Sequence, residues 1–473
     1  MDILYITSEA VPFAKTGGLA DVSGSLPKAF EEIGTHCRVV LPLYESIPAK
    51  LRETMHFLCH FQVPVAWRTQ YCGVFEAKVG NVIYYFIDNE YYFKRPNCYG
   101  YYDEAERFVF FARAVLEMLP KIDFKPDILH ANDWQTGLVP VFLNAFYRRV
   151  PFYERMETVF TVHNVEYQGK YGYEIYSDVL GLPEQLFHLL DFNQCLNFMK
   201  GAIISSDAVT TVSPTYSHEL RYPDFSFGLD PVFNSIGYKL HGILNGINTE
   251  DYNPATDPAL FKSYSVKAPQ NKQANKVALQ KMLGLPVDKN AFLLAYIGRL
   301  VPAKGIALIQ RILEELLNDS VQFVLLGTGE TTYEQYFHTM QEQHPNKMVA
   351  CLTFSEELAR KIYAGADALL MPSRTEPCGL SQLIALRYGT VPIVHQIGGL
   401  ADTVSDCGDV KGNGFTFKQF NAHDMLRAIR RAEGLFFDQP KDWAKLREHA
   451  MQCDFSWKRS VLTYQKIYEG LFR

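Results

Sequence analysis

Residues 292–305, FLLAYIGRLVPAKG, contain the unit from which the fold is built. The run FLLAYIG hardly alternates between apolar and polar residues, which is typical of a strand covered on both faces. A turn with glycine and proline follows, and the residues after it repeat with the helical period. Four apolar residues share one face of that predicted helix: Ile312, Leu313, Leu316 and Leu317. The stretch therefore predicts a strand, a turn and a helix that covers the strand.

Similar apolar runs recur in two series, separated by longer amphipathic stretches. The first series lies at residues 2–7, 38–43, 82–88, 127–130, 158–164 and 208–213, and the second at 292–298, 321–327, 348–354, 368–373 and 391–396. Strands that alternate with helices predict parallel sheets in doubly wound α/β domains.

The two series meet at residues 241–254, which are rich in glycine, asparagine and proline, as linkers are. We therefore expect an N-terminal domain over residues 1–245 and a C-terminal domain over residues 246–455. Ligands of such sheets bind beyond the carboxyl ends of the strands, so the cleft between the domains is the expected site.

Composition excludes several classes of protein. The chain has 473 residues, of which 48% are hydrophobic and 21% charged, and its formal net charge is −6. This balance excludes disorder and collagen, and the mild acidity argues against a general binder of nucleic acids or anionic membranes. Nine scattered cysteines without a C-x-x-C pair indicate reduced thiols. With no signal peptide and no membrane-length apolar run in sight, we expect a cytoplasmic protein.

The letters GGLAD occur at residues 17–21 and again at 398–402, each time after a strand-like run. Duplication of an ancestral domain would explain the repeat. Convergence would explain it too, because two glycines followed by helix formers make a good helix start.

Two glycine-containing turns carry cations that could meet an anion. Lys15 precedes Gly17 and Gly18 soon after the first strand, where bare N–H groups at a helix start attract negative charge. Arg299 and Lys304 follow a strand of the second series, and an Arg and a Lys at that spacing can converge on one diphosphate. Neither turn is a P-loop or a dinucleotide fingerprint, so a nucleotide kinase and an NAD dehydrogenase both lack their motif.

Polar groups also end other predicted strands. Residues 130–134 (HANDW) and 161–164 (TVHN) lie at the ends of two strands of the first series, and residues 373–380 (SRTEPCGL) follow one of the second. A carboxylate such as that of Glu376 could hold a sugar hydroxyl there, with the N–H groups of the turn beside a phosphate. Packing residues and an ordinary surface turn are the simpler interpretations of each motif alone.

Taken together, these motifs resemble the bacterial and plant glycogen (starch) synthases, glycosyltransferase family five, in order and over nearly the whole chain. The stretches that carry the resemblance are SEAVPFAKTGGLADV, HANDWQTGLVP, TVHNVEYQG, SDAVTTVSPTYSHEL, GILNGIN, IGRLVPAKG, PSRTEPCGLSQLIALRYGTVPIV and GGLADTV. The resemblance implies two facing Rossmann-like domains, the GT-B fold, with the active site in the interdomain cleft. The N-terminal domain would be the acceptor side and the C-terminal domain the nucleotide-sugar side. Together with the aromatic residues after residue 454, it implies that a helix over residues 456–473 crosses back to the N-terminal domain.

The implied activity is that of a retaining hexosyltransferase. It would move glucose from ADP-glucose to the non-reducing 4-OH of an α-1,4-glucan and so elongate glycogen, without a metal or another cofactor. Its partners would be ADP-glucose and the glucan acceptor, with no nucleic acid and no membrane.

Site residues carry over from the motifs. The implied catalytic residues are Asp133, His163, Arg299, Lys304 and Glu376. The implied ADP-glucose ligands are Lys15, Gly18, Asp21, Asn245, Arg299, Lys304, Phe354, Glu376, Cys378, Gly379, Leu380 and Ser381. Among them, His163 would accept a hydrogen bond from a glucose hydroxyl or donate through its backbone, and Asp133 would orient the sugar.

Two mechanisms agree with this set of residues. In the favoured one, the acceptor hydroxyl attacks the sugar on the same face from which the diphosphate departs. The cationic sugar and the diphosphate form a short-lived ion pair, whose diphosphate Arg299 and Lys304 stabilise. In the rival mechanism, Glu376 is the nucleophile of a double displacement.

The chain departs from the family at Phe354 and Phe93, where tyrosine is common, and at the apolar residues 301–303. Phenylalanine at 354 keeps a ring to stack on the base but loses a hydroxyl, so ADP-glucose is the expected donor and UDP-glucose the alternative. A phosphorylase would need a longer chain and a pyridoxal-bearing lysine. A non-catalytic glucan-binding protein would have no reason to keep the cations, and a sucrose- or trehalose-type transferase is the nearest enzymatic alternative.

Overall fold

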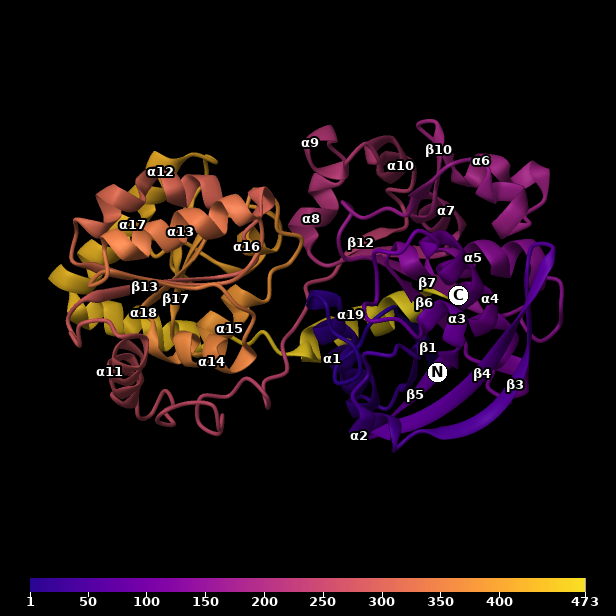
Figure 1. Cartoon of the computed structure of the whole chain (residues 1–473), viewed down its shortest axis with the longest axis horizontal. Helices are drawn as coiled ribbons and strands as arrows, with labels where there is room; N and C mark the ends of the chain where they lie inside the picture. The colour runs from indigo at the N-terminus through magenta and orange to yellow at the C-terminus, as the bar shows by residue number, and fades with distance from the viewer. Residues whose placement is uncertain (473) are drawn as a thin grey trace. The chain divides into compact units, whose positions relative to one another are not determined.

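The computed structural model describes residues 1–472, which form two compact units. The N-terminal unit comprises Met1–Gly246 together with the helix that begins at Trp457, and the C-terminal unit comprises Ile247–Ser456. Each unit is an α/β domain with its own sheet (Figure 1). The predicted fold class of two α/β domains is confirmed.

The N-terminal unit is built on a sheet with the strand order β12-β11-β7-β6-β1-β2-β5-β4-β3. Its strands are β1 (Asp2–Ile6), β2 (His36–Pro42), β3 (His56–Val65), β4 (Arg68–Val79), β5 (Val82–Asp88), β6 (Ile128–Asn132), β7 (Glu157–Val162), β11 (Ala208–Thr211) and β12 (Leu240–Gly242). All neighbours are parallel except β4, which is antiparallel to β3 and to β5. A small separate sheet has the order β8-β10-β9, formed by β8 (Lys170–Tyr171), β9 (Asp191–Phe192) and β10 (Cys195–Asn197).

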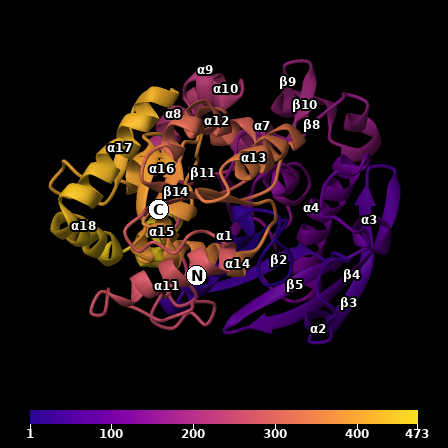
Figure 2. The ribbon, with the colours of Figure 1, turned by 60° about the vertical axis from the view of Figure 1, so that its left-hand side comes forward.

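The hairpin of β3 and β4 was not among the predicted strands. Figure 2 shows it as a long ribbon at one edge of the N-terminal unit. Most residues of β3 are exposed or half-buried, so this strand lacks the continuous apolar run of the central strands. An antiparallel edge is solvated on part of its surface and therefore gives a weaker sequence signal than a buried parallel strand.

The C-terminal unit has a parallel sheet with the order β15-β14-β13-β16-β17-β18. Its strands are β13 (Phe292–Ile297), β14 (Val321–Leu326), β15 (Met348–Cys351), β16 (Ala368–Met371), β17 (Val391–His395) and β18 (Phe415–Phe417). The predicted second series of strands is confirmed, and β18 extends it at the edge.

Helices cover both sheets. Those of the N-terminal unit are α1 (Gly18–Glu32), α2 (Ala49–Arg52), α3 (Glu90–Phe93), α4 (Glu104–Lys121), α5 (Leu138–Phe142), α6 (Phe187–Leu190), α7 (Phe198–Ser205), α8 (Pro214–Glu219), α9 (Pro223–Ser226), α10 (Asp230–Ser235) and α19 (Trp457–Leu471), with the helical turns η1 (Trp134–Thr136), η2 (Leu143–Tyr147), η3 (Tyr176–Leu180) and η4 (Glu184–Leu186). Those of the C-terminal unit are α11 (Asn271–Leu283), α12 (Ile306–Leu317), α13 (Thr331–Gln343), α14 (Glu356–Gly365), α15 (Ser381–Arg387), α16 (Gly398–Thr403), α17 (Ala422–Asp438) and α18 (Pro440–Gln452), with the turn η5 (Pro302–Lys304).

Helix α12 shows how the sequence pattern becomes a core. The four apolar residues predicted to share a face, Ile312, Leu313, Leu316 and Leu317, are all buried in the core of the C-terminal unit. Each fully buried side chain of this size contributes about 1.5–3 kcal/mol relative to an exposed one. Leu300, in the turn that precedes α12, belongs to the same core.

The C-terminal helix α19 packs within the N-terminal unit. Tyr464 and Tyr468 are buried, and their rings contact Phe30 of α1 at centroid distances of 6.1 and 5.6 Å. The hydroxyl of Ser460 donates to the carbonyl oxygen of Leu244 at 2.5 Å. In Figure 1 this helix, drawn in yellow, lies beside the indigo helix α1. The chain therefore returns to its first unit for its last helix.

No helix among residues 1–472 is long and apolar enough to cross a membrane.

Candidate active site

The first group of predicted residues lies where β1 leads into α1. Helix α1 begins at Gly18, and the ammonium of Lys15 lies 2.8 Å from a carboxylate oxygen of Asp21 on its first turn. Both side chains are partly exposed. The structure thus brings Lys15, Gly18 and Asp21 together at one turn.

Sequence reasoning missed Glu9, which lies behind this turn. Its carboxylate accepts the backbone N–H of Thr16 at 2.5 Å, and Glu9 is 4% exposed. Burial raises the pKa of Glu9, while hydrogen bonds from Thr16 and Gly17 lower it. The backbone N–H groups of this turn were expected to face a substrate anion. Those of Thr16 and Gly17 instead donate to the carboxylate of Glu9 within the protein. An acid directly after a buried strand, in SEAVPFAKTGG, was the available signal.

Asp133 and His163 meet at the carboxyl ends of β6 and β7. The Asp133 carboxylate accepts the backbone N–H of His163 at 2.7 Å and that of Asn164 at 3.4 Å. Burial raises the pKa of Asp133 to about 7, although the two N–H groups lower it. The backbone of Asp133 has φ +55°, which is uncommon for a residue with a side chain and is typical of functional sites.

The His163 ring is held by a defined hydrogen bond. Its Nε2 lies 2.9 Å from Oδ1 of Asn132, whose amide nitrogen donates to the carbonyl oxygens of Ile6 and His130. Because Oδ1 of Asn132 can only accept, His163 must donate from Nε2, which leaves Nδ1 as the acceptor. Burial lowers the pKa of His163 to about 3, so the ring is neutral at pH 7. Since the backbone N–H already donates to Asp133, the side chain is the part of His163 left for a sugar hydroxyl.

Asn245 lies at the linker end of the N-terminal unit and is 5% exposed. Its side-chain oxygen is buried and has no hydrogen-bond partner among the described residues. A buried acceptor without a partner is costly, so such a group in a native structure needs an explanation, and a ligand is one.

The C-terminal unit brings together Lys304 and Glu376 from two different turns. The Lys304 ammonium lies 2.8 and 2.6 Å from the two carboxylate oxygens of Glu376, and the hydroxyl of Ser373 donates to the second oxygen at 2.7 Å. Glu376 is buried and Lys304 is about one-quarter exposed. Arg299, on the exposed side of the same turn, is fixed at its backbone by the hydroxyl of Tyr296, which donates to its carbonyl oxygen at 2.8 Å.

Close backbone packing joins these turns. The N–H of Arg374 donates to the carbonyl oxygen of Ala303 at 2.8 Å, and the N–H of Gly399 donates to that of Glu376 at 3.0 Å. A Cβ at Gly305, which has φ +72°, would overlap the carbonyl oxygen of Pro372, and one at Gly399 would overlap the backbone of Cys378. Glycine at both positions therefore allows residues 299–305, 373–380 and 398–402 to form one cluster.

The remaining predicted residues extend this cluster. Cys378 is buried, and Gly379 has φ +74°. Leu380 and Ser381 start helix α15, and the amide of Gln382 donates to the carbonyl oxygens of Cys378 and Gly379 at 2.8 and 3.1 Å. Phe354 follows β15 and is 78% exposed, so its ring is open to a partner.

The predicted residues thus form two groups, one in each unit, both at the carboxyl ends of parallel strands. The N-terminal group contains Lys15, Gly18, Asp21, Asp133, His163 and Asn245, and the C-terminal group contains Arg299, Lys304, Phe354, Glu376, Cys378, Gly379, Leu380 and Ser381. No cluster of three or more His, Cys, Asp or Glu side chains among residues 1–472 is arranged to hold a metal ion.

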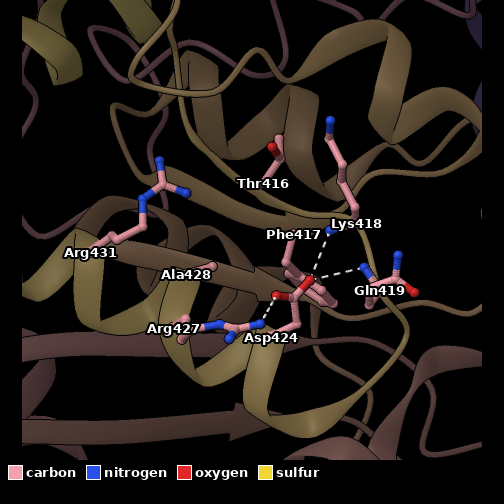
Figure 3. A pocket seen from close by; sticks show the side chains of 8 residues that line it. All are labelled: Thr416, Phe417, Lys418, Gln419, Asp424, Arg427, Ala428 and Arg431. Carbon is pink, nitrogen blue, oxygen red and sulfur yellow. Dashed lines mark hydrogen bonds and ion pairs between the residues drawn. The ribbon is translucent and has the colours of Figure 1, made fainter.

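A pocket of about 420 Å³ lies elsewhere, on the C-terminal unit where β18 leads into α17 (Figure 3). Three of its four charged side chains are already paired: Asp424 accepts the backbone N–H groups of Lys418 and Gln419 and pairs with Arg427, while Arg431 pairs with Asp406. None of the predicted site residues lines it.

Two family models match the chain, one within the range of each unit. Residues 2–235 match the family described as the starch synthase catalytic domain, and residues 281–448 match the glycosyl transferases group 1. A glycogen synthase of Geobacillus thermodenitrificans is 49% identical over 100% of this chain and 98% of its own, and one of Bacillus cereus is 46% identical over 100% of both.

Solved structures give the same result. The catalytic domain of starch synthase IV from Arabidopsis thaliana, bound to ADP and acarbose, superposes with a TM-score of 0.94 at 35% identity, over 100% of this chain and 99% of that one. A sucrose-phosphate synthase from Thermosynechococcus elongatus shares the fold alone, with a TM-score of 0.63 at 17% identity over 100% of this chain and 99% of that one. The chain therefore belongs to the glycogen (starch) synthase family, whose members are hexosyltransferases with the GT-B fold.

Proposed function

We propose that this chain transfers glucose from ADP-glucose to the non-reducing 4-OH of an α-1,4-glucan, with retention of the anomeric configuration, and so elongates glycogen. The observation that carries the proposal is the bonded pair of Lys304 and Glu376 beside the exposed Arg299. Cations for a diphosphate and a carboxylate for a sugar occur there side by side. The relatives named glycogen synthase and the starch synthase bound to ADP and acarbose support the same substrates.

The two groups of residues bind different parts of the substrates. In the C-terminal unit, Arg299 and Lys304 hold the diphosphate, Phe354 stacks on the base, and Glu376 with residues 378–381 lies beside the glucose. In the N-terminal unit, Lys15 and Gly18 meet the phosphate and glucose region, while Asp21 and Asn245 line the nucleotide side. Asp133 and His163 orient the sugar, His163 accepting a hydroxyl hydrogen at Nδ1, the nitrogen that Asn132 leaves unprotonated.

The chemistry is a same-face substitution. As the bond between glucose and the diphosphate breaks, the sugar gains positive charge and the leaving group gains negative charge. Arg299 and Lys304 stabilise the leaving group, and Glu376 stabilises the sugar. The acceptor 4-OH then forms the new glycosidic bond, and the departing phosphate takes its proton.

The contacts of Glu376 favour this route over a double displacement. Both of its carboxylate oxygens accept hydrogen bonds from Lys304, and one also accepts from Ser373. An ion-paired and hydrogen-bonded carboxylate is a weaker nucleophile than a free one, whereas its charge still acts on a neighbouring cation. A covalent glucosyl adduct on Glu376, trapped by rapid quench and found by mass spectrometry, would instead establish the double displacement.

One assay tests the reaction and the donor together. Radiolabelled ADP-glucose and UDP-glucose are each supplied with glycogen, fructose or glucose phosphate as acceptor. We expect label from ADP-glucose in glycogen, in linkages that an α-1,4-specific hydrolase releases. Label in sucrose or a phosphorylated disaccharide would show a sucrose- or trehalose-type transferase, and faster transfer from UDP-glucose would overturn the donor assignment.

We further propose that the enzyme works in the cytoplasm. All nine cysteines are free thiols, which suits a reducing compartment.

A further inference from the structure

A buried hydrogen-bonded chain links the C-terminal helix to the sheet below the proposed sugar site. The hydroxyl of Tyr468 on α19 lies 2.7 Å from Nδ1 of His130 on β6, whose Nε2 lies 2.6 Å from the hydroxyl of Thr161 on β7. That hydroxyl in turn lies 2.6 Å from the hydroxyl of Thr210 on β11. All four side chains are fully buried. The last helix of the chain is thereby bonded to three central strands.

The direction of this chain follows from the buried phenol. Burial raises the pKa of Tyr468 well above its ordinary value, so its O–H stays protonated and needs an acceptor. Among residues 1–472 that acceptor is Nδ1 of His130, and burial lowers the pKa of His130 to about 3, so its ring is neutral. His130 therefore carries its proton on Nε2 and donates to Thr161, which donates to Thr210. The phenol of Tyr468, as donor to Nδ1, thus favours this tautomer.

The same pattern repeats one step nearer the site. Asn132 lies two residues after His130 on β6, so the two side chains point to the same face of the sheet. His163 lies two residues after Thr161, just past the end of β7, and its Nε2 is 2.9 Å from Oδ1 of Asn132. The two hydrogen bonds, His130 to Thr161 and His163 to Asn132, are connected through the backbone, because the amide of Asn132 donates to the backbone carbonyl of His130 at 3.2 Å.

We propose that Tyr468 is a positioning residue for glucosyl transfer, acting through His130 and Thr161 on the strand ends that carry Asp133 and His163. The inference rests on the proposed function, because it takes His163 as a sugar ligand. It goes further in making the C-terminal helix part of the machinery of the site. Without the phenolic hydroxyl, the ring of His130 can exchange between tautomers, so His130 no longer always donates in its hydrogen bond with Thr161.

The test uses the full chain and the variant Tyr468→Phe, which keeps the ring and removes the hydroxyl. We expect kcat to fall about three- to tenfold, the effect of one positioned hydrogen bond, with less than a twofold change in KM for ADP-glucose. Tyr84→Phe is the matched control, because the buried hydroxyl of Tyr84 in the same unit has no hydrogen-bond partner among the described residues. It should keep the parental kcat.

A second variant guards against misfolding and tests the connection. Thr161→Val removes the hydrogen bond between His130 and Thr161 from the Thr161 side. If both residues act through His130, the fold losses in kcat from Thr161→Val and Tyr468→Phe should not multiply in the double variant. Histidine-selective ¹⁵N spectra give a readout that a merely structural role would not move. The ring signals of both His130 and His163 should shift in Tyr468→Phe and stay in place in Tyr84→Phe.

Parental turnover with unmoved His163 signals in Tyr468→Phe would overturn the inference, as would losses that multiply in the double variant. These outcomes are distinguishable from failure of the proposed function. A parent chain that transfers no glucose would refute the function, while the nitrogen spectra would still decide whether Tyr468 controls the ring of His163.

Discussion

The ammonium of Lys304 lies 2.8 and 2.6 Å from the two carboxylate oxygens of Glu376, and this pair joins two turns that are 72 residues apart in the sequence. Glu376 is held further by the hydroxyl of Ser373, so its orientation is fixed by groups on both sides. A positioned carboxylate and a positioned cation of this kind stabilise opposite charges as they develop, without reorganisation.

Replacing Glu376 by glutamine should abolish most of the rate. The variant Glu376→Gln keeps the size of the side chain and one acceptor oxygen but removes the charge that stabilises a cationic sugar; its amide nitrogen cannot accept the second hydrogen bond from Lys304. We expect kcat to fall about 10²–10³-fold with little change in KM for ADP-glucose. Steady-state kinetics with glycogen as acceptor would measure both. Near-parental turnover would mean that the cluster is an ordinary surface turn.

Replacing Lys304 by alanine tests the other half of the pair. Because Lys304 stabilises the leaving diphosphate mainly in the transition state, we expect Lys304→Ala to lower kcat about 10²–10³-fold as well, again with a modest change in KM. Lys445→Ala is the control, since it removes an exposed lysine that is paired with Asp442 at 2.8 Å on the same unit. Equal rates for the two variants would contradict the assignment of Lys304.

Gly399→Ala should damage the site through packing. An added Cβ would overlap the backbone of Cys378, so the loop that precedes α15 would have to move. We expect a loss of about 1–3 kcal/mol of stability in urea unfolding, together with reduced turnover. Gly434→Ala adds the same atom within α17, where the nearest atom is 4.0 Å away, and should raise stability by about 0.5–1 kcal/mol. If both variants behaved alike, the close approach would not matter.

Asp133 should make the stability of the protein depend on pH. Its pKa is about 7 in the folded chain and near 3.8 in the unfolded one, so the folded state binds the proton more tightly. The stabilisation from this proton is complete below about pH 4 and is lost as the pH rises toward 7, at no more than about 1.4 kcal/mol per pH unit.

The variant Asp133→Asn isolates this group. Glu157 and Glu433 also have a pKa of about 7, but they are present in both chains and cancel in the difference. Urea unfolding at several pH values should therefore show the variant gaining stability relative to the parent between pH 5 and about 7. A difference that does not change with pH would contradict the raised pKa of Asp133.

Glucosyl transfer should not depend on a divalent metal. Arg299 and Lys304 already supply positive charge to the leaving diphosphate, the task that a metal performs at many other phosphate sites. Turnover in excess chelator should equal turnover with added magnesium. A loss of more than tenfold on chelation would refute this expectation.

Sequence reasoning succeeded where a local pattern determines the structure. The apolar runs of the central strands and the buried face of α12 were readable, because a strand covered on both faces and a helix covered on one leave distinct periodicities. It missed the hairpin of β3 and β4, where that signal is weak, and it missed Glu9. A buried carboxylate that accepts the N–H of Thr16 has no signature beyond its position after a strand.

What the sequence by itself determined is the alternation of the central strands with helices, the two α/β domains and the family, and it supplied the residues that we propose for the site. Each follows from short patterns or ordered motifs that the chain carries regardless of its folding. Only the tertiary structure decided which atoms are engaged: that Lys304 is bonded to Glu376, that the N–H of His163 is taken by Asp133, and that Tyr468 reaches His130. Such contacts join residues up to 338 positions apart, and because hydrogen bonds depend on distance and direction, they exist only once packing has fixed both.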